Sequence, residues 1–228
     1  MAHKESKFLH QQKIALGVGA VVVLAVLAYV TSIVIRDSAP LGNYVAGEHY
    51  TLLENPKRVR GDKIEVVEFF SYACIHCYRF DPDLEGWVED NQDRIKFIRN
   101  PVVASDLWAR FARHYYTMES LGIVEDLHYK FFNAVHDRNL NTSSKERLAE
   151  WAEDNGVENY LESYDSAEVR RKVATADATA RGLQIANVPS MVINGKYLVR
   201  ITETVGPVRM LDIVDHLLQL ETAPPPAQ

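Results

Sequence analysis

The chain has 228 residues, 47% of them apolar and 25% charged, with a formal net charge of −6. This much apolar surface excludes a chain that is disordered as a whole. Two cysteines are too few for a disulfide-stapled scaffold, and an acidic chain without a basic stripe argues against nucleic acid as a partner.

The first feature along the chain is an uncharged apolar run of 22 residues, Ile14–Ile35. As a helix it would span roughly 33 Å, which is enough to cross a hydrocarbon core of about 30 Å. It is also longer than the apolar region of a cleavable signal peptide. Three lysines precede it, so the positive-inside rule keeps the N-terminal tail in the cytoplasm and exports the rest. We expect a retained signal anchor. The alternative is a long signal peptide cut near Ser38–Ala39, and it exports the same domain.

Strands and one helix follow a short tether. A weak strand is expected at residues 49–53 and another at residues 94–103. The strongest strand signal is Ile64–Phe70, which is β-branched, aromatic and too short for a surface helix. A helix is expected from Cys74 to about Asn91, interrupted by Pro82.

From residue 106 to residue 181 the apolar side chains recur with the helical period of three and four. Four helices are expected: one over residues 107–121 ending at Gly122, one around residues 127–135, one opened by the capping-box match Ser143–Glu146, and one capped by Ser166 and ending at Gly182. Their aromatic stripes could line a cofactor pocket, but a small helical core is the favoured interpretation.

β-Structure returns after these helices. Residues 190–193 and 196–199 flank Asn194-Gly195, the strongest short hairpin signal, and Pro207–Leu220 has the pattern of a last amphipathic helix. The order of elements predicts a small α/β domain with a helical domain inserted in its middle.

Both cysteines belong to one motif, Cys74-Ile75-His76-Cys77. A zinc site would need four ligands, and no second cysteine pair exists. A structural disulfide across so short a loop would stabilise the fold little. A redox-active pair is favoured, because Cys74 would open a helix, where free N–H groups and the helix dipole stabilise a thiolate. His76 could add a hydrogen bond or a positive charge.

Glu68 alternates with Ile64, Val66 and Phe70 on one face of its strand. A carboxyl group among three apolar neighbours should be desolvated and its pKa raised. A solvated residue at a sheet edge is the alternative.

The motif and its surroundings resemble the DsbA family of bacterial thiol oxidases in the thioredoxin superfamily. Residues 66–78, VVEFFSYACIHCY, are similar to that family's active-site strand and helix, and residues 187–197, NVPSMVINGKY, to its cis-proline loop and hairpin. Residues 49–56, HYTLLENP, are similar to its first strand. The resemblance extends through most of residues 47–221. One departure is Ile75, where the family usually has proline, and the predicted anchor is another.

The resemblance implies roles for six residues. Cys74 and Cys77 would form the redox-active disulfide, with His76 beside them and Glu68 as proton acceptor for the buried Cys77. A cis Val188-Pro189 bond would bring the backbone of Val188 against the sulfurs, where it could pair with an extended substrate strand.

We therefore predict a thioredoxin fold with an inserted all-helical domain, preceded by one transmembrane helix. The expected segments are a cytoplasmic tail (1–13), the anchor (14–35), a linker (36–46), a thioredoxin-like domain in two parts (47–104 and 177–221), the helical insertion (105–176) and a flexible tail (222–228).

The predicted activity is the introduction of disulfides into exported proteins by dithiol–disulfide exchange, without metal or organic cofactor. The predicted anchor places the enzyme in the bacterial inner membrane with its catalytic domain in the periplasm, and we expect a monomer. The resemblance implies a DsbB-like membrane protein as reoxidant. A reductase or isomerase on the same scaffold, or a peptide-binding chaperone with an incidental CxxC, are the alternatives.

Overall fold

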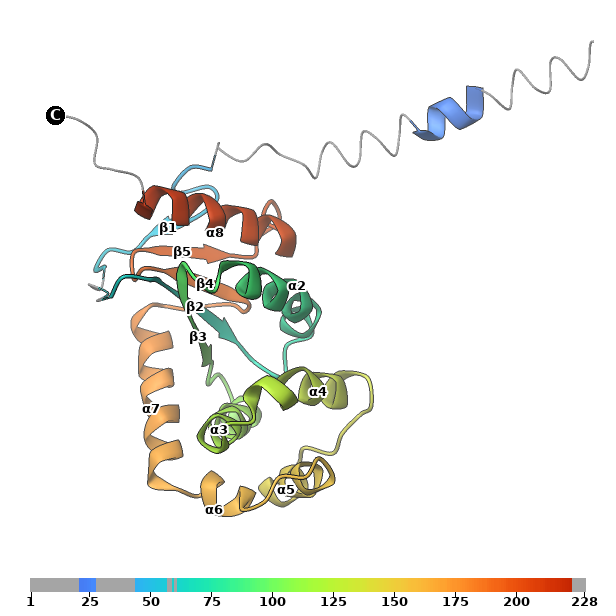
Figure 1. Cartoon of the computed structure of the whole chain (residues 1–228), viewed down its shortest axis with the longest axis vertical. Helices are drawn as coiled ribbons and strands as arrows, with labels where there is room; N and C mark the ends of the chain where they lie inside the picture. The colour runs from blue at the N-terminus through green and yellow to red at the C-terminus, as the bar shows by residue number, and fades with distance from the viewer. Residues whose placement is uncertain (1–20, 28–43, 57–58, 60, 223–228) are drawn as a thin grey trace, which may run out of the picture. The chain divides into compact units, whose positions relative to one another are not determined.

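The computed structural model describes residues 21–27, 44–56, 59 and 61–222 (Figure 1). The chain divides into two units, Met1–Asn43 and Tyr44–Gln228. In the first unit, residues 21–27 are helical with exposed side chains. The rest of the predicted anchor, the whole cytoplasmic tail and most of the linker lie outside the described residues, as does nearly all of the C-terminal tail. In the described part of the chain, no helix is both long enough and apolar enough to cross a membrane.

The second unit is built on a five-stranded sheet of order β1-β5-β4-β2-β3. The strands are β1 (Thr51–Leu52), β2 (Ile64–Phe70), β3 (Ile95–Pro101), β4 (Ser190–Ile193) and β5 (Tyr197–Arg200). β3 runs parallel to β2, whereas the other neighbouring pairs are antiparallel. The strongest predicted strand, β2, is thus an interior strand between β4 and β3.

Strand alternation gives the sheet two apolar faces. On one face, helices α2 (Ile75–Asn91) and α8 (Pro207–Thr222) pack on Val66 and Met191. On the other face, Phe69 and Val192 pack with the end of α7 (Ala167–Gly182). The sheet is therefore buried on both sides, which agrees with the continuous apolar character of β2.

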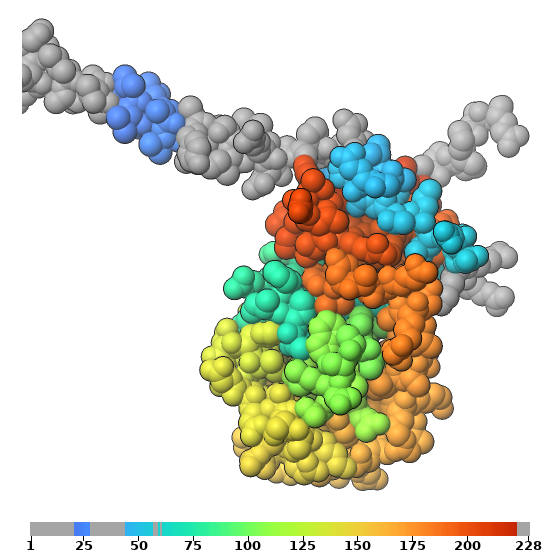
Figure 2. Space-filling model, turned by 180° about the vertical axis from the view of Figure 1, so that it is seen from behind, coloured from blue at the N-terminus to red at the C-terminus, as the bar shows by residue number. Residues whose placement is uncertain are grey.

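The helical block comprises α3 (Asp106–Leu121), α4 (Val124–His136), α5 (Lys145–Asp154), α6 (Tyr160–Tyr164) and most of α7, which returns to the sheet (Figure 1). Its stripes bury Phe111, Phe131 and Phe132 in one aromatic core, so the interpretation as a core is confirmed. Phe70 and Cys77 belong to the same core. In the space-filling view the block, coloured from lime through yellow to light orange, adjoins the α/β part along a continuous surface (Figure 2).

The predicted cap of the third helix is displaced by one residue. Ser144, and not Ser143, is the N-cap of α5, and its side chain accepts a hydrogen bond from the backbone N–H of Arg147. The N–H of Ser143 is bonded instead to the side chain of Asn141, which makes Ser143 part of the preceding turn. The capping-box match was therefore wrong by one position.

Other boundaries were predicted closely. Gly122 adopts a left-handed conformation beyond α3, and Ser166 caps α7. Asn194 and Gly195 both have positive φ in the β4–β5 turn. The sequence missed α6, which has only five residues. Helix α7 runs without interruption across residue 176, where we placed the end of the insertion; the domain boundaries stay predictions.

Candidate active site

The Cys74-Ile75-His76-Cys77 motif opens α2, as predicted. A tight turn precedes it, in which the N–H of Cys74 donates to the carbonyl of Ser71 at 2.9 Å. Cys74 is the N-cap of the helix, and its sulfur accepts the backbone N–H of Cys77 at 3.3 Å. Both cysteines are free thiols. Cys74 is partly exposed, whereas Cys77 is fully buried, so only Cys74 is open to attack by a protein thiol.

The two sulfurs have opposite acidities. The pKa of Cys74 is lowered from 9.0 to about 6, first by the thiol of Cys77, which donates to its sulfur, and then by backbone N–H groups of the first helical turn, against the opposing effect of burial. The charge of His76 adds least among these effects, because its side chain is exposed and screened by solvent. Burial raises the pKa of Cys77 well above its ordinary value, and the neighbouring Cys74 raises it further. At pH 7 Cys74 is therefore mostly thiolate, whereas Cys77 is a thiol.

The Val188-Pro189 peptide bond is cis. The carbonyl oxygen of Val188 lies 3.5 Å from the sulfur of Cys74. The Ser190 hydroxyl donates to the carbonyl of Asn187 at 2.7 Å and ties the loop to the start of β4. This places the predicted loop against the predicted cysteine.

Glu68 is buried on the interior strand β2, with 1% of its surface exposed. The alternative of a solvated edge residue is wrong. Arg99 lies opposite it on β3, with Nε 3.2 Å from Oε2, although neither atom has a well-aligned hydrogen-bond partner. Desolvation outweighs this attraction and raises the pKa of Glu68 from 4.5 to about 8.

Four further residues extend this buried cluster, and the sequence analysis did not identify them. Arg99 contacts the carboxylates of Asp81, at 3.4 Å, and of Glu85. Asp81 accepts from His128 Nε2 at 3.1 Å. Two signals were available: an arginine directly after the apolar pair Phe97-Ile98 of β3, and a histidine within the apolar stripe of α4.

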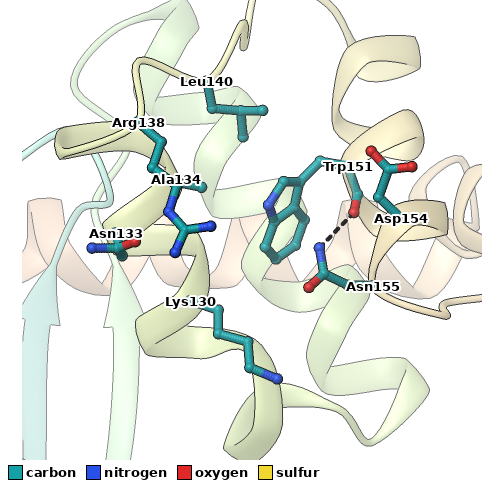
Figure 3. A pocket seen from close by; sticks show the side chains of 8 residues that line it. All are labelled: Lys130, Asn133, Ala134, Arg138, Leu140, Trp151, Asp154 and Asn155. Carbon is teal, nitrogen blue, oxygen red and sulfur yellow. Dashed lines mark hydrogen bonds between the residues drawn. The ribbon is translucent and has the colours of Figure 1, made fainter.

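A separate hollow of about 520 Å³ lies between α4 and α5 (Figure 3). Trp151 forms its wall, with Lys130 and Arg138 on one side and Asp154 and Asn155 on the other. Neither thiol lines it. Among the described residues, no group of three or more His, Cys, Asp or Glu side chains is arranged to hold a metal ion.

Residues 95–218 match the model of the DSBA-like thioredoxin domain. The chain is 34% identical over 189 residues to the thiol:disulfide interchange protein DsbA of Pseudomonas aeruginosa, covering 82% of this chain and 90% of that protein. The chain belongs to the DsbA family. The DsbA of Azotobacter vinelandii is 33% identical over 161 residues, which is 70% of this chain and 75% of that protein.

Solved DsbA structures agree with this assignment. The crystal structure of Pseudomonas aeruginosa DsbA matches with a TM-score of 0.74 at 34% identity, over 78% of this chain and 95% of the other. That of Xylella fastidiosa DsbA also has a TM-score of 0.74, at 28% identity, over 80% and 100%. The protein is accordingly a DsbA-type thiol–disulfide oxidoreductase with a thioredoxin-like α/β fold, and it acts by disulfide exchange with substrate proteins.

Proposed function

We propose that this DsbA family member is an oxidase that donates its Cys74–Cys77 disulfide to reduced cysteines of exported proteins. The observation that carries the direction is the lowered pKa of Cys74 at the N-terminus of α2. Stabilising this thiolate stabilises the reduced enzyme, and an enzyme with a stable reduced form is a strong oxidant.

The exchange has two steps. A substrate thiolate attacks the sulfur of Cys74 and forms a mixed disulfide, and the electron pair of the broken S–S bond leaves on Cys77. The second thiolate of the substrate then attacks the substrate sulfur of the mixed disulfide, and Cys74 leaves as a thiolate. The substrate loses two electrons and the enzyme gains them as its dithiol.

Cys77 needs a proton when it leaves, because its buried thiolate is strongly disfavoured. In this proposal Glu68 stores the proton for Cys77, since a carboxyl group with a pKa of about 8 is mostly protonated at pH 7. It gives a proton when Cys77 is released. It accepts one again when Cys77 must attack during reoxidation.

Val188 supplies the substrate-binding edge in this proposal. Its carbonyl is already next to the sulfur of Cys74, so an extended peptide bound there would bring its cysteine to the site of attack. Pro189 has no N–H and therefore does not compete for the backbone of the peptide.

The test of the oxidase direction is the equilibrium between the Cys74–Cys77 pair and glutathione, together with a titration of the Cys74 thiolate absorbance. An oxidase gives a titration midpoint near 6 and a pair that glutathione readily reduces. A midpoint near 8.5, the value of a free thiol, would defeat the proposal. A Cys74→Ser variant that kept its full function in binding unfolded substrate proteins would instead favour the chaperone interpretation, because an oxidoreductase loses its activity with this cysteine.

The proposal extends to the setting of the enzyme. A retained anchor would hold it as a monomer in the bacterial inner membrane, with the catalytic unit in the periplasm and a DsbB-like quinone reductase reoxidising it. The apolar run of residues 14–35 and the lysines before it support this topology. A reporter that is active only outside the cytoplasm should work when fused after Gln228, and the chain should stay with membranes after carbonate washing. Release of a shortened soluble form would show cleavage.

A further inference from the structure

Tyr72 lies two residues before Cys74, in the loop between β2 and α2, and two histidines of α4 hold it. Its phenol oxygen is 2.6 Å from Nδ1 of His128. Its backbone carbonyl accepts a hydrogen bond from Nε2 of His136 at 2.9 Å. The Tyr72 side chain is buried, with 1% of the residue exposed, so both ends of one residue are bonded to one helix of the insertion.

The partners of His128 define its protonation. Its Nε2 lies 3.1 Å from a carboxylate oxygen of Asp81, which can only accept, so Nε2 carries the hydrogen. Nδ1 is then free to accept the hydroxyl of Tyr72. The neutral ring satisfies both contacts at once. His128 therefore links the loop before the active site to α2, the helix that the cysteines open.

His136 makes a second link to the same helix. Its ring stacks on that of Tyr78, with centroids 5.2 Å apart and an angle of 6° between planes. Tyr78 directly follows Cys77. Helix α4 thus contacts Tyr72 before the CxxC motif and Tyr78 directly after it.

We propose that His128 and His136 are positioning residues that hold Tyr72 and thereby fix the sulfur of Cys74 at the start of α2. The bond from the Cys77 N–H to this sulfur is 3.3 Å long, and a hydrogen bond weakens steeply as it lengthens or bends. A loop that is free to shift would stabilise the thiolate less. The inference deepens the proposed oxidase function and rests on it.

The first experiment compares two buried tyrosines whose hydroxyls each lie 2.6 Å from the Nδ1 of a buried histidine. Tyr72→Phe removes a hydroxyl bonded at 2.6 Å to the Nδ1 of a buried histidine, His128. Tyr160→Phe removes one bonded at 2.6 Å to the Nδ1 of His114, also buried but within the helical block. Both variants should lose thermal stability. Only Tyr72→Phe should raise the Cys74 titration midpoint, by about 0.3 or more, and shift the glutathione equilibrium about twofold or more toward a weaker oxidant.

The second experiment tests the other histidine. His136→Ala removes the hydrogen bond to the carbonyl of Tyr72 and should shift the midpoint in the same direction. His136→Gln retains a side-chain N–H donor and should restore most of the wild-type value, which a role in packing alone would not predict.

Different outcomes would overturn the oxidase proposal and the positioning role of the two histidines. A wild-type midpoint near 8.5 defeats the oxidase proposal itself. A low wild-type midpoint that stays unchanged in folded Tyr72→Phe and folded His136→Ala overturns the positioning role and leaves the oxidase proposal intact. An equal shift in Tyr160→Phe would also overturn it, because any loss in the helical core would then suffice.

Discussion

Glu68→Gln decides whether the buried acid of β2 is neutral or forms an ion pair with Arg99. Gln has the shape of a protonated glutamic acid, so it should replace neutral Glu68 at little cost in the folded state. The unfolded chain ionises Glu68 near pH 4.5, whereas the folded protein ionises it near pH 8. Between these values the folded state binds one more proton, so wild-type stability falls as pH rises through this window. At pH 7 the loss is roughly 3 kcal/mol, and Glu68→Gln should recover most of it.

The assay is denaturant unfolding of the reduced protein at pH 4 and at pH 7. The two proteins should be nearly equal at pH 4, where Glu68 is protonated in both states. At pH 7 the variant should be more stable by roughly 3 kcal/mol, which in a thermal melt corresponds to a melting temperature higher by about 6–12 °C for a unit of this size. A variant that is less stable at pH 7 would refute the reasoning, because it would show that Glu68 is ionised and held by Arg99. A gain that is independent of pH would refute it as well.

Three smaller predictions follow from the same structure. His76→Ala should raise the thiolate midpoint of Cys74 by less than about half a unit in an absorbance titration, since this exposed ring adds less than the groups of the helix end. Ile75→Pro should shift the reduction potential by less than about 30 mV in a glutathione titration, because proline fits the first turn of a helix and the donors around Cys74 stay in place. Ser144→Ala should cost about 1 kcal/mol of unfolding free energy, whereas Ser143→Ala should cost little, since only Ser144 caps α5.

Sequence signals that depend on neighbouring residues predicted the elements of the fold well. The Asn194-Gly195 turn, the Ser166 cap and the period of α3 each depend on residues within a few positions of one another, so the sequence contains all of the necessary information. The displaced cap of α5 shows the limit of such signals. Two adjacent serines match the pattern almost equally well, and the turn made by Asn141 selects between them.

The residues of the site could be predicted only where a sequence motif or the alternation of side chains along a strand indicated them. Cys74 and Cys77 follow from their spacing, and the burial of Glu68 follows from its place among apolar residues. Arg99 and His128 could not be assigned a role in this way. Their partners lie on other elements of the chain. Glu68 is 31 residues away from Arg99, and Tyr72 is 56 residues away from His128. Only the folded sheet and the docked helices bring these pairs together.

The buried charges explain why the helical segment belongs to the active site and does not merely cover it. Arg99 lies inside the protein against Glu68 and Asp81, and a buried charge is costly unless it is paired and hydrogen-bonded. Oδ1 of Asp81 contacts Arg99 and also accepts from His128, which α4 supplies. The α/β part alone would leave this buried oxygen with the Arg99 contact at 3.4 Å and without the 3.1 Å hydrogen bond from His128. The helical block must therefore dock before the acid cluster gains the hydrogen bond from His128, which agrees with residues 44–228 forming one compact unit.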